Sequence, residues 1–215
     1  MFKRFYIVML SVLKKIKWIL TGDKKEQQIE LFIPNSNIKN NIKYKVPEEY
    51  TLKRYNKIYE GQILQLYNEV RFKFDKLILL NAMYLCVPSG IFVIVHNKTE
   101  KVVAAFMARH LSDEIHPIGG RIDWLAVDPE HRDKHLGFIV TAACVNRLVE
   151  IGYHNIYVTT DDDRLGAIKT FLKAGFVPNL FSEEMHSRWE MICNLLEIPF
   201  QPKEWNISKE ELDSY

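Results

Sequence analysis

The sequence predicts an α/β or α+β domain, in which strands and helices alternate along the chain and build one sheet with its covering helices. From about residue 47 onward, short apolar stretches typical of buried strands alternate with longer stretches at helical spacing. Two of the apolar stretches are joined by a polar turn, residues 96–100, which is typical of a hairpin. Hydrophobic residues make up 47% of the 215-residue chain, so the chain can bury a sizeable core.

The first half of the domain combines a hairpin with a pair of helices. The spacing of apolar residues distinguishes the two kinds of element, because strands alternate and helices repeat every three to four residues. Pro88-Ser89-Gly90 is expected to stop the second helix. The expected elements are a strand over 50–55, helices over 61–72 and 75–86, and strands over 91–95 and 102–110.

The second half repeats the alternation, with turn residues at the element boundaries. Asp128-Pro129 ends a strand, while Gly152 and Gly175 end helices. Ser182 is placed as an N-cap, and Ser208-Lys209-Glu210-Glu211 fits the capping-box pattern of a short last helix. The expected elements are strands over 121–127 and 155–160 and helices over 136–151, 164–174, 183–197 and from Ser208.

Composition divides the chain into four segments: a basic amphipathic helix over 1–22, a polar linker over 23–46, the sheet domain over 47–200, and a tail with a short helix over 201–215. In residues 1–22 the apolar side chains share one helical face, and no residue is acidic. A secretory signal is disfavoured because Lys14 and Lys15 interrupt the apolar run. Peripheral contact with an anionic membrane and docking on the domain or on a second copy both remain open.

Charge and cysteine content exclude several functional classes. The chain has 29 basic and 27 acidic residues, a formal net charge of +2, which argues against a nucleic-acid-binding protein. The three cysteines are far apart and indicate free thiols in a reducing compartment. The histidines show no metal-ligand spacing, so no metal is expected. Without an apolar run long enough to span a membrane, the expected location is cytoplasmic, with peripheral membrane contact as the alternative.

One segment, residues 121–178, carries the chemistry. A buried strand leads to the basic loop His131-Arg132-Asp133-Lys134-His135, after which Gly137 opens a long apolar helix. The free N–H groups and the dipole of a helix N-terminus favour an anion such as phosphate, and Arg132 and Lys134 add positive charge. On the loop alone, an ordinary strand–turn–helix junction with solvated charges is an equally good interpretation.

The same segment resembles the GNAT acetyltransferase superfamily. The family pattern V-x-P-x-x-R-x-x-G-x-G stands here as Val127-Asp128-Pro129-Glu130-His131-Arg132-Asp133-Lys134-His135-Leu136-Gly137. The second half of the pattern, a strand and then a helix that ends in G-F, stands here as Ile156–Thr160 and Ala167–Phe176. Thr160-Asp161-Asp162-Asp163-Arg164-Leu165 resembles the T-D-D-x-R-L junction of one bacterial branch. The two halves recur at the right separation.

The resemblance implies a mixed, mostly antiparallel sheet with two splayed parallel central strands, residues 125–127 and 157–159. It implies acetyl-CoA as cosubstrate and a small-molecule or protein amine as acceptor, which attacks the thioester directly. The helices of residues 61–86 would border the acceptor site. The implied cofactor-binding residues are Leu125, Ala126, Val127, Arg132, Asp133, Lys134, His135, Leu136, Gly137 and Phe138.

Three residues bear on whether the chemistry is retained. His135 replaces the first glycine of the loop pattern, and glycine lets backbone approach phosphate closely. Phe171 stands where many members have a tyrosine that protonates the leaving thiolate, and phenylalanine has no proton to give. Asp123 is the candidate catalytic base, with a purely structural hydrogen bond as the alternative. A degenerate CoA-binding or interaction module is therefore the second hypothesis, and the oligomeric state is open.

Overall fold

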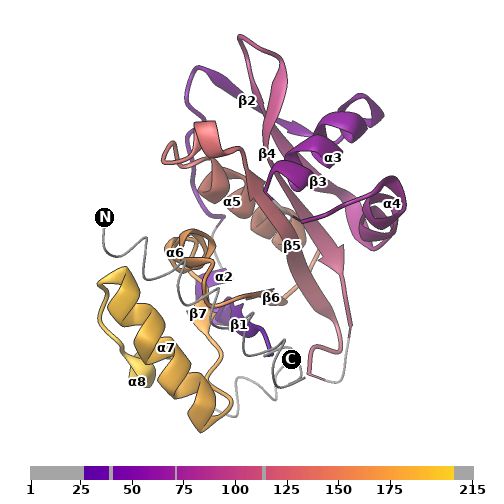
Figure 1. Cartoon of the computed structure of the whole chain (residues 1–215). Coiled ribbons are helices and arrows are strands. Elements are labelled where there is room, and N and C mark those ends of the chain that lie inside the picture. Colours follow the sequence, from indigo (N-terminus) through magenta and orange to yellow (C-terminus); the bar gives the residue numbers. More distant parts are fainter. Residues whose placement is uncertain (1–26, 39–40, 71, 113–114, 206–215) are drawn as a thin grey trace, which may run out of the picture.

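The computed structural model describes residues 27–38, 41–70, 72–112 and 115–205. The strands in these ranges are β1 (Ile29–Phe32), β2 (Tyr50–Arg54), β3 (Cys86–His96), β4 (Lys101–His110), β5 (Gly119–Val127), β6 (Asn155–Thr160) and β7 (Val177–Pro178). They form one sheet in the order β2-β3-β4-β5-β6-β1-β7 (Figure 1). Every neighbouring pair is antiparallel except β5–β6, which is parallel. The predicted mixed, mostly antiparallel sheet is therefore confirmed.

Helices cover both faces of the sheet. They are α2 (Asn35–Ile38), α3 (Glu60–Glu69), α4 (Lys76–Tyr84), α5 (Leu136–Glu150), α6 (Leu165–Lys173), α7 (Glu183–Leu196) and α8 (Pro202–Trp205), with 3-10 helices η1 (Lys57–Tyr59) and η2 (Pro129–His131). Figure 1 shows α3 and α4 on one side of the sheet and α5, α6 and α7 on the other. Two separate apolar layers result, one under α5, α6 and α7 and one under α3 and α4.

The first apolar layer is the larger and fixes the helix that follows the basic loop. On α5, Leu136, Val140 and Cys144 recur at four-residue spacing and are buried against the sheet. On the other face, Ile63, Leu66 and Tyr67 of α3 pack into the second layer. The sheet between them carries almost continuous apolar residues, because strands buried on both faces have no solvent side.

The structure corrects the prediction of a polar linker over 23–46. β1 lies inside that segment and pairs antiparallel with β6, from Ile29 opposite Thr160 to Phe32 opposite Tyr157, and also with β7. Ile29 and Leu31 are fully buried. A four-residue strand between polar stretches gives a weak sequence signal, and only its tertiary pairing shows that it belongs to the sheet.

The strand after α4 also differs from the expectation. α4 ends at Tyr84 and β3 already begins at Cys86, so Pro88-Ser89-Gly90 lies within the strand rather than ending a helix. The pairing with β4 is interrupted between Cys86 and Ile91, which is where a proline is tolerated in a sheet. A Cβ on Gly90 would lie 2.6 Å from the Ala108 carbonyl oxygen, so this close approach requires glycine.

Two predictions fall outside the described residues: the amphipathic helix over 1–22 and the capped helix from Ser208. Of the helices that the structure describes, none has the length and apolar character needed to cross a membrane.

Candidate active site

The two parallel strands at the centre of the sheet separate along their length. β5 and β6 pair only at Gly119–Asn155, Gly120–Ile156 and Arg121–Tyr157. Both strands continue, to Val127 and Thr160, but no further residues pair. The strands therefore open into a wedge toward their carboxyl ends after the Arg121–Tyr157 pair, which confirms that the two parallel strands are splayed, although Tyr157 itself is still paired.

A bulge in β5 accompanies the opening. Ala126 pairs with Ala105 and Asp123 with Met107, so β5 contains one more residue than β4 between these pairs. Trp124, the residue in the bulge, has φ +68° in the left-handed region. Bulges bend a strand and increase its twist, which here turns the end of β5 away from β6.

Asp128 fixes the loop that follows β5. Its carboxylate accepts hydrogen bonds from the Glu130 N–H (2.9 Å) and from Lys101 Nζ (2.8 Å). Burial alone would raise the pKa of Asp128, but these hydrogen bonds and the nearby positive charges outweigh it and lower the pKa. The loop thus leaves the strand in a defined direction before α5 begins.

The start of α5 is open to an anion. His135 is its N-cap residue at φ +59°, and no side chain caps the helix there. The N–H groups of the first turn consequently lack the usual side-chain acceptor. Gly137 lies close to both β5 and α6, since a Cβ on it would be 3.5 Å from Val127 Cγ2 and 3.7 Å from Thr170 Oγ1. The helix N-terminus therefore faces the space between these two elements.

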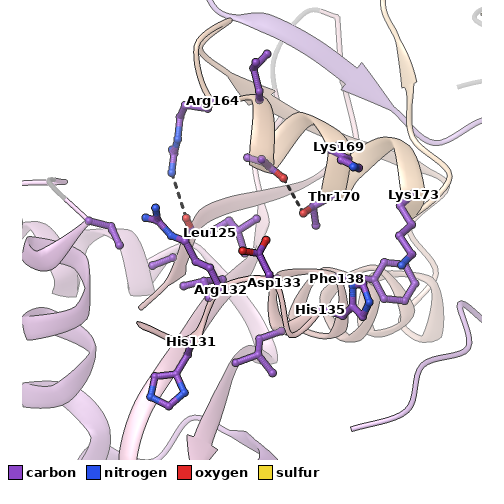
Figure 2. Close-up of a pocket in the computed structure, with 18 of the residues that line it drawn as sticks. Leu125, His131, Arg132, Asp133, His135, Phe138, Arg164, Lys169, Thr170 and Lys173 are labelled. Atoms are coloured by element: carbon purple, nitrogen blue, oxygen red, sulfur yellow. Dashed lines mark hydrogen bonds between the residues drawn. The ribbon is translucent and has the colours of Figure 1, made fainter. Parts of the chain in front are cut away.

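That space is a cleft of about 880 Å³ at the open end of the wedge (Figure 2). Its cationic side chains are Arg132, Arg164, Lys169 and Lys173, against the acidic Asp133 and Asp163. Its remaining lining residues are Val70, Leu125, Ala126, Val127, His131, His135, Leu136, Gly137, Phe138, Leu165, Gly166, Ala167 and Thr170. A helix N-terminus joined by an excess of cations favours a multiply charged anion.

Arg164 bridges the two separated strands. It follows β6 in the chain, and its Nη2 donates a hydrogen bond to the Leu125 carbonyl of β5 (3.3 Å) (Figure 2). Its guanidinium also lies 4.6 Å from the centroid of the Phe72 ring, a cation–π contact. Burial lowers the pKa of Arg164. The Arg164 side chain thus donates a hydrogen bond to a carbonyl of β5 at a residue that is not paired with another strand.

The structure gathers most of the predicted cofactor residues at the cleft, but not the Lys134 side chain. Lys134 Nζ donates to the Tyr50 hydroxyl (2.9 Å), and that hydrogen bond raises the pKa of Lys134. Sequence reasoning missed Arg164, Lys169 and Lys173. The two lysines stand four residues apart on α6, which places them on one helical face, and this spacing is the signal that could have found them.

Asp123 and Phe171 lie outside the cleft wall. Asp123 is buried and accepts hydrogen bonds from Arg109 Nη1 (2.6 Å) and Arg121 Nε (2.8 Å). Phe171 is buried in the core, stacked on Phe106 with ring centroids 6.0 Å apart. Neither residue 171 nor the cleft lining supplies a tyrosine hydroxyl. Across the part of the chain that the structure describes, no cluster of His, Cys, Asp or Glu is arranged to hold a metal ion.

Comparison with known proteins agrees with this geometry. The model of the acetyltransferase (GNAT) family matches residues 56–176, more than half of the chain. Mycothiol acetyltransferase of Nocardia farcinica is 26% identical over 91 residues, which cover 42% of this chain and 30% of that protein.

Solved structures share the fold. A GCN5-related N-acetyltransferase from Sphaerobacter thermophilus aligns with a TM-score of 0.54 at 14% identity, over 71% of this chain and 49% of that one. Another, from Kribbella flavida, aligns with a TM-score of 0.51 at 15% identity, over 70% and 54%. The chain thus spans about half the length of these structures and less than a third of the curated relative. The family match, together with the wedge and its cleft, shows that the chain belongs to the GNAT acetyltransferase family.

Proposed function

We propose that the protein transfers an acetyl group from acetyl-CoA to a primary amine. One observation carries the proposal: two parallel strands separate beside a cation-lined cleft at an uncapped helix N-terminus. A pyrophosphate fits such a helix terminus, and an extended amide-containing chain fits a strand edge that has lost its partner.

The residues of the cleft divide between the two ends of such a molecule. Backbone N–H groups from Arg132 to Phe138 would hold the pyrophosphate oxygens, with Arg132, Lys169 and Lys173 adding charge. The unpaired edge of β5, residues 125–127, would bind the pantetheine arm as an added strand. Arg164 would then either release the Leu125 carbonyl or remain beside the arm as a second donor.

Acetyl-CoA supplies the acetyl group as a thioester: the neutral amine forms the C–N bond, the C–S bond breaks, and CoA leaves as a thiolate that takes a proton from water. The chain's own contribution is to position both reactants. Asp123, beside the narrow end of the wedge, is our proposed acceptor of the amine's proton, directly or through water. Each of its oxygens accepts one guanidinium hydrogen bond and keeps a further lone pair.

A CoA-binding protein without turnover is the second candidate function. Phe171 favours it, because it is buried and offers no proton to a leaving thiolate at the position where many family members have a tyrosine. This candidate predicts saturable acetyl-CoA binding with no release of CoA in the presence of any amine.

Calorimetry of acetyl-CoA binding tests the cofactor site. Arg132→Glu should weaken binding about ten-fold or more, because it places a negative charge beside the phosphates. Arg54→Glu is the matched control, since Arg54 is exposed on the edge strand β2, and it should leave the affinity unchanged. No binding by the folded wild type, or equal losses in both variants, would contradict the proposed site. CoA release over an amine panel then separates the enzyme from the binding module.

A further inference from the structure

A charged group, formed by Arg109, Arg121 and Asp123, lies on the face of the sheet that α3 and α4 cover, and none of its members lines the cleft. Asp123 pairs with Met107, which belongs to the apolar layer under α3 and α4. Arg109 and Arg121 pair two positions further along the same strands. Because side chains alternate along strands, all three polar side chains share that face.

This group closes the narrow end of the wedge. Arg121 donates from Nε to Asp123 and from Nη2 to Thr159 Oγ1 of β6 (2.8 Å). Residue 121 is also the last position at which β5 and β6 pair. The guanidinium of Arg121 therefore spans the two strands at the point where they begin to separate.

The group carries more positive than negative charge. Arg109 and Arg121 share the single carboxylate of Asp123, which gives a net charge of +1. The side chains of Arg109 and Arg121 are 12% and 24% exposed, so both are largely desolvated. In a partly desolvated site an unbalanced guanidinium attracts an anion more strongly than it would in water.

Hydrogen-bond donors around this group also lack acceptors. Among the described residues, Arg109 Nε, the Tyr67 hydroxyl and Trp124 Nε1 are buried with no hydrogen-bond partner. Arg109 Nε and Trp124 Nε1 can only donate, and the hydroxyl can donate. Buried donors without acceptors are costly, so the site favours a ligand or water that brings lone pairs.

An aromatic cluster places these groups beside the proposed reaction site. Trp124, in the β5 bulge, lies edge-on to Phe72 and Phe74, with centroids 5.5 and 4.8 Å away. The Phe72 ring also makes the cation–π contact with Arg164, whose guanidinium donates a hydrogen bond to the Leu125 carbonyl of β5. The cluster thus connects the wedge to the face that bears Arg121.

We propose that the amine acceptor carries an anionic group, a carboxylate or a phosphate, which Arg109 and Arg121 bind on the α3–α4 face. This inference rests on the proposed function. If the acetyl group of acetyl-CoA is held in the wedge, the amine acceptor would approach it from the α3–α4 face. A cationic polyamine or a lysine-rich peptide would meet like charge there.

Paired acceptors test the proposal on the wild-type protein. CoA release is measured with 4-aminobutyrate against butylamine and with glucosamine 6-phosphate against glucosamine. The two members of each pair carry the same kind of amine and differ by one carboxylate in the first pair and by one phosphate in the second. The comparison therefore shows whether the site prefers a carboxylate or a phosphate. We expect kcat/KM to be about ten-fold or more higher for at least one anionic member than for its neutral partner.

Arg121→Gln should remove that preference by raising KM for the anionic acceptor, while calorimetry shows unchanged acetyl-CoA affinity. Lys98→Gln is the control, because it removes one exposed charge from the turn at the opposite end of β4 and should change neither quantity. If Arg121→Gln does not fold, Tyr67→Phe removes one orphan donor without changing the ring, and it should reduce the same preference.

Equal kcat/KM within both pairs, a preference that survives in Arg121→Gln, or turnover of the neutral amines without turnover of the anionic ones would each overturn the proposal. Failure of the proposed function has a different signature: the wild type then either does not bind acetyl-CoA in the calorimeter, or binds it and releases no CoA with any amine, neutral or anionic.

Discussion

His135 occupies a backbone position that favours glycine. Its φ of +59° lies in the left-handed region, where a side chain costs roughly 1–2 kcal/mol and glycine costs nothing. Asp133, two residues earlier, is also left-handed at φ +62°. The loop before α5 therefore keeps the backbone path that favours glycine at residue 135, although histidine stands there.

His135→Gly should raise the free energy of unfolding by about 0.5–1 kcal/mol, because the strain removed exceeds the entropy that glycine adds to the unfolded chain. It should also tighten acetyl-CoA binding in calorimetry, since the side chain no longer flanks the helix N-terminus. His154→Gly serves as the control, because His154 is exposed and has no left-handed backbone. Urea unfolding should show that His154→Gly leaves the free energy of unfolding unchanged or lowers it. A destabilised His135→Gly would argue that the histidine side chain holds the loop.

The position of the basic loop beside the cleft could be predicted because its signals are local: a proline, a glycine and basic residues at fixed spacing. The direction of Lys134 could not, because it depends on Tyr50, 84 positions away in the chain. The partners of Asp123 were hidden for the same reason. Arg109 reaches it only through the pairing of β4 with β5, and sequence spacing does not show which strands pair.

At the scale of elements, the loop after β5 is attached to the edge strand β2 by a chain of hydrogen bonds. Lys134 Nζ donates to the Tyr50 hydroxyl, and that hydroxyl is 2.9 Å from His131 Nδ1. Because the ammonium donates to the hydroxyl oxygen, the hydroxyl proton is free to go to an unprotonated Nδ1. Burial lowers the pKa of His131, which agrees with a neutral ring.

A pH dependence of stability follows from the burial of His131 beside Tyr50. The folded protein binds fewer protons at His131 than the unfolded chain, so stability should fall as the pH drops through and below about 6.5. Tyr50→Phe should lower the free energy of unfolding by about 1 kcal/mol at pH 7.5. It should also flatten the decline toward pH 5, because His131 no longer accepts the hydroxyl proton.

Urea unfolding at pH 5 and 7.5 provides the measurement. Tyr44→Phe is the matched control, since Tyr44 is exposed and its hydroxyl has no hydrogen bond in the described part of the structure. An unchanged pH slope in Tyr50→Phe would mean that burial, and not the Tyr50 hydroxyl, keeps His131 neutral.

Long elements such as α5 and β4 were predictable, because their apolar pattern extends over several helical turns or over many successive strand residues. β1 and β7 were not, because strands of four and two residues carry too little pattern. Their place in the sheet depends on non-local pairing, with β1 joining β6 and β7 across more than a hundred residues of chain.

For the whole molecule, β1 makes the sheet depend on an early segment. Removing residues 1–38 would take Ile29 and Leu31 out of the core and leave β6 and β7 without the strand between them. We expect that truncation to lose cooperative unfolding in urea. Removing residues 1–22 should preserve it, together with acetyl-CoA binding.

The shorter truncation also tests the membrane hypothesis. Flotation with vesicles that contain anionic lipid should depend on residues 1–22 if their basic amphipathic pattern binds a membrane surface. Equal flotation with and without the segment would argue against that role.

The short pairing between β5 and β6 divides the sheet into two plates joined by a narrow seam. Three paired positions connect β2-β3-β4-β5 with β6-β1-β7 in the described structure, supplemented by Arg121 to Thr159 and Arg164 to Leu125. A molecule that pairs with the free edge of β5 would add bonds along this seam. A molecule bound in the wedge would therefore couple the motions of the two parts of the sheet, so we expect the protein to be most rigid with that molecule bound.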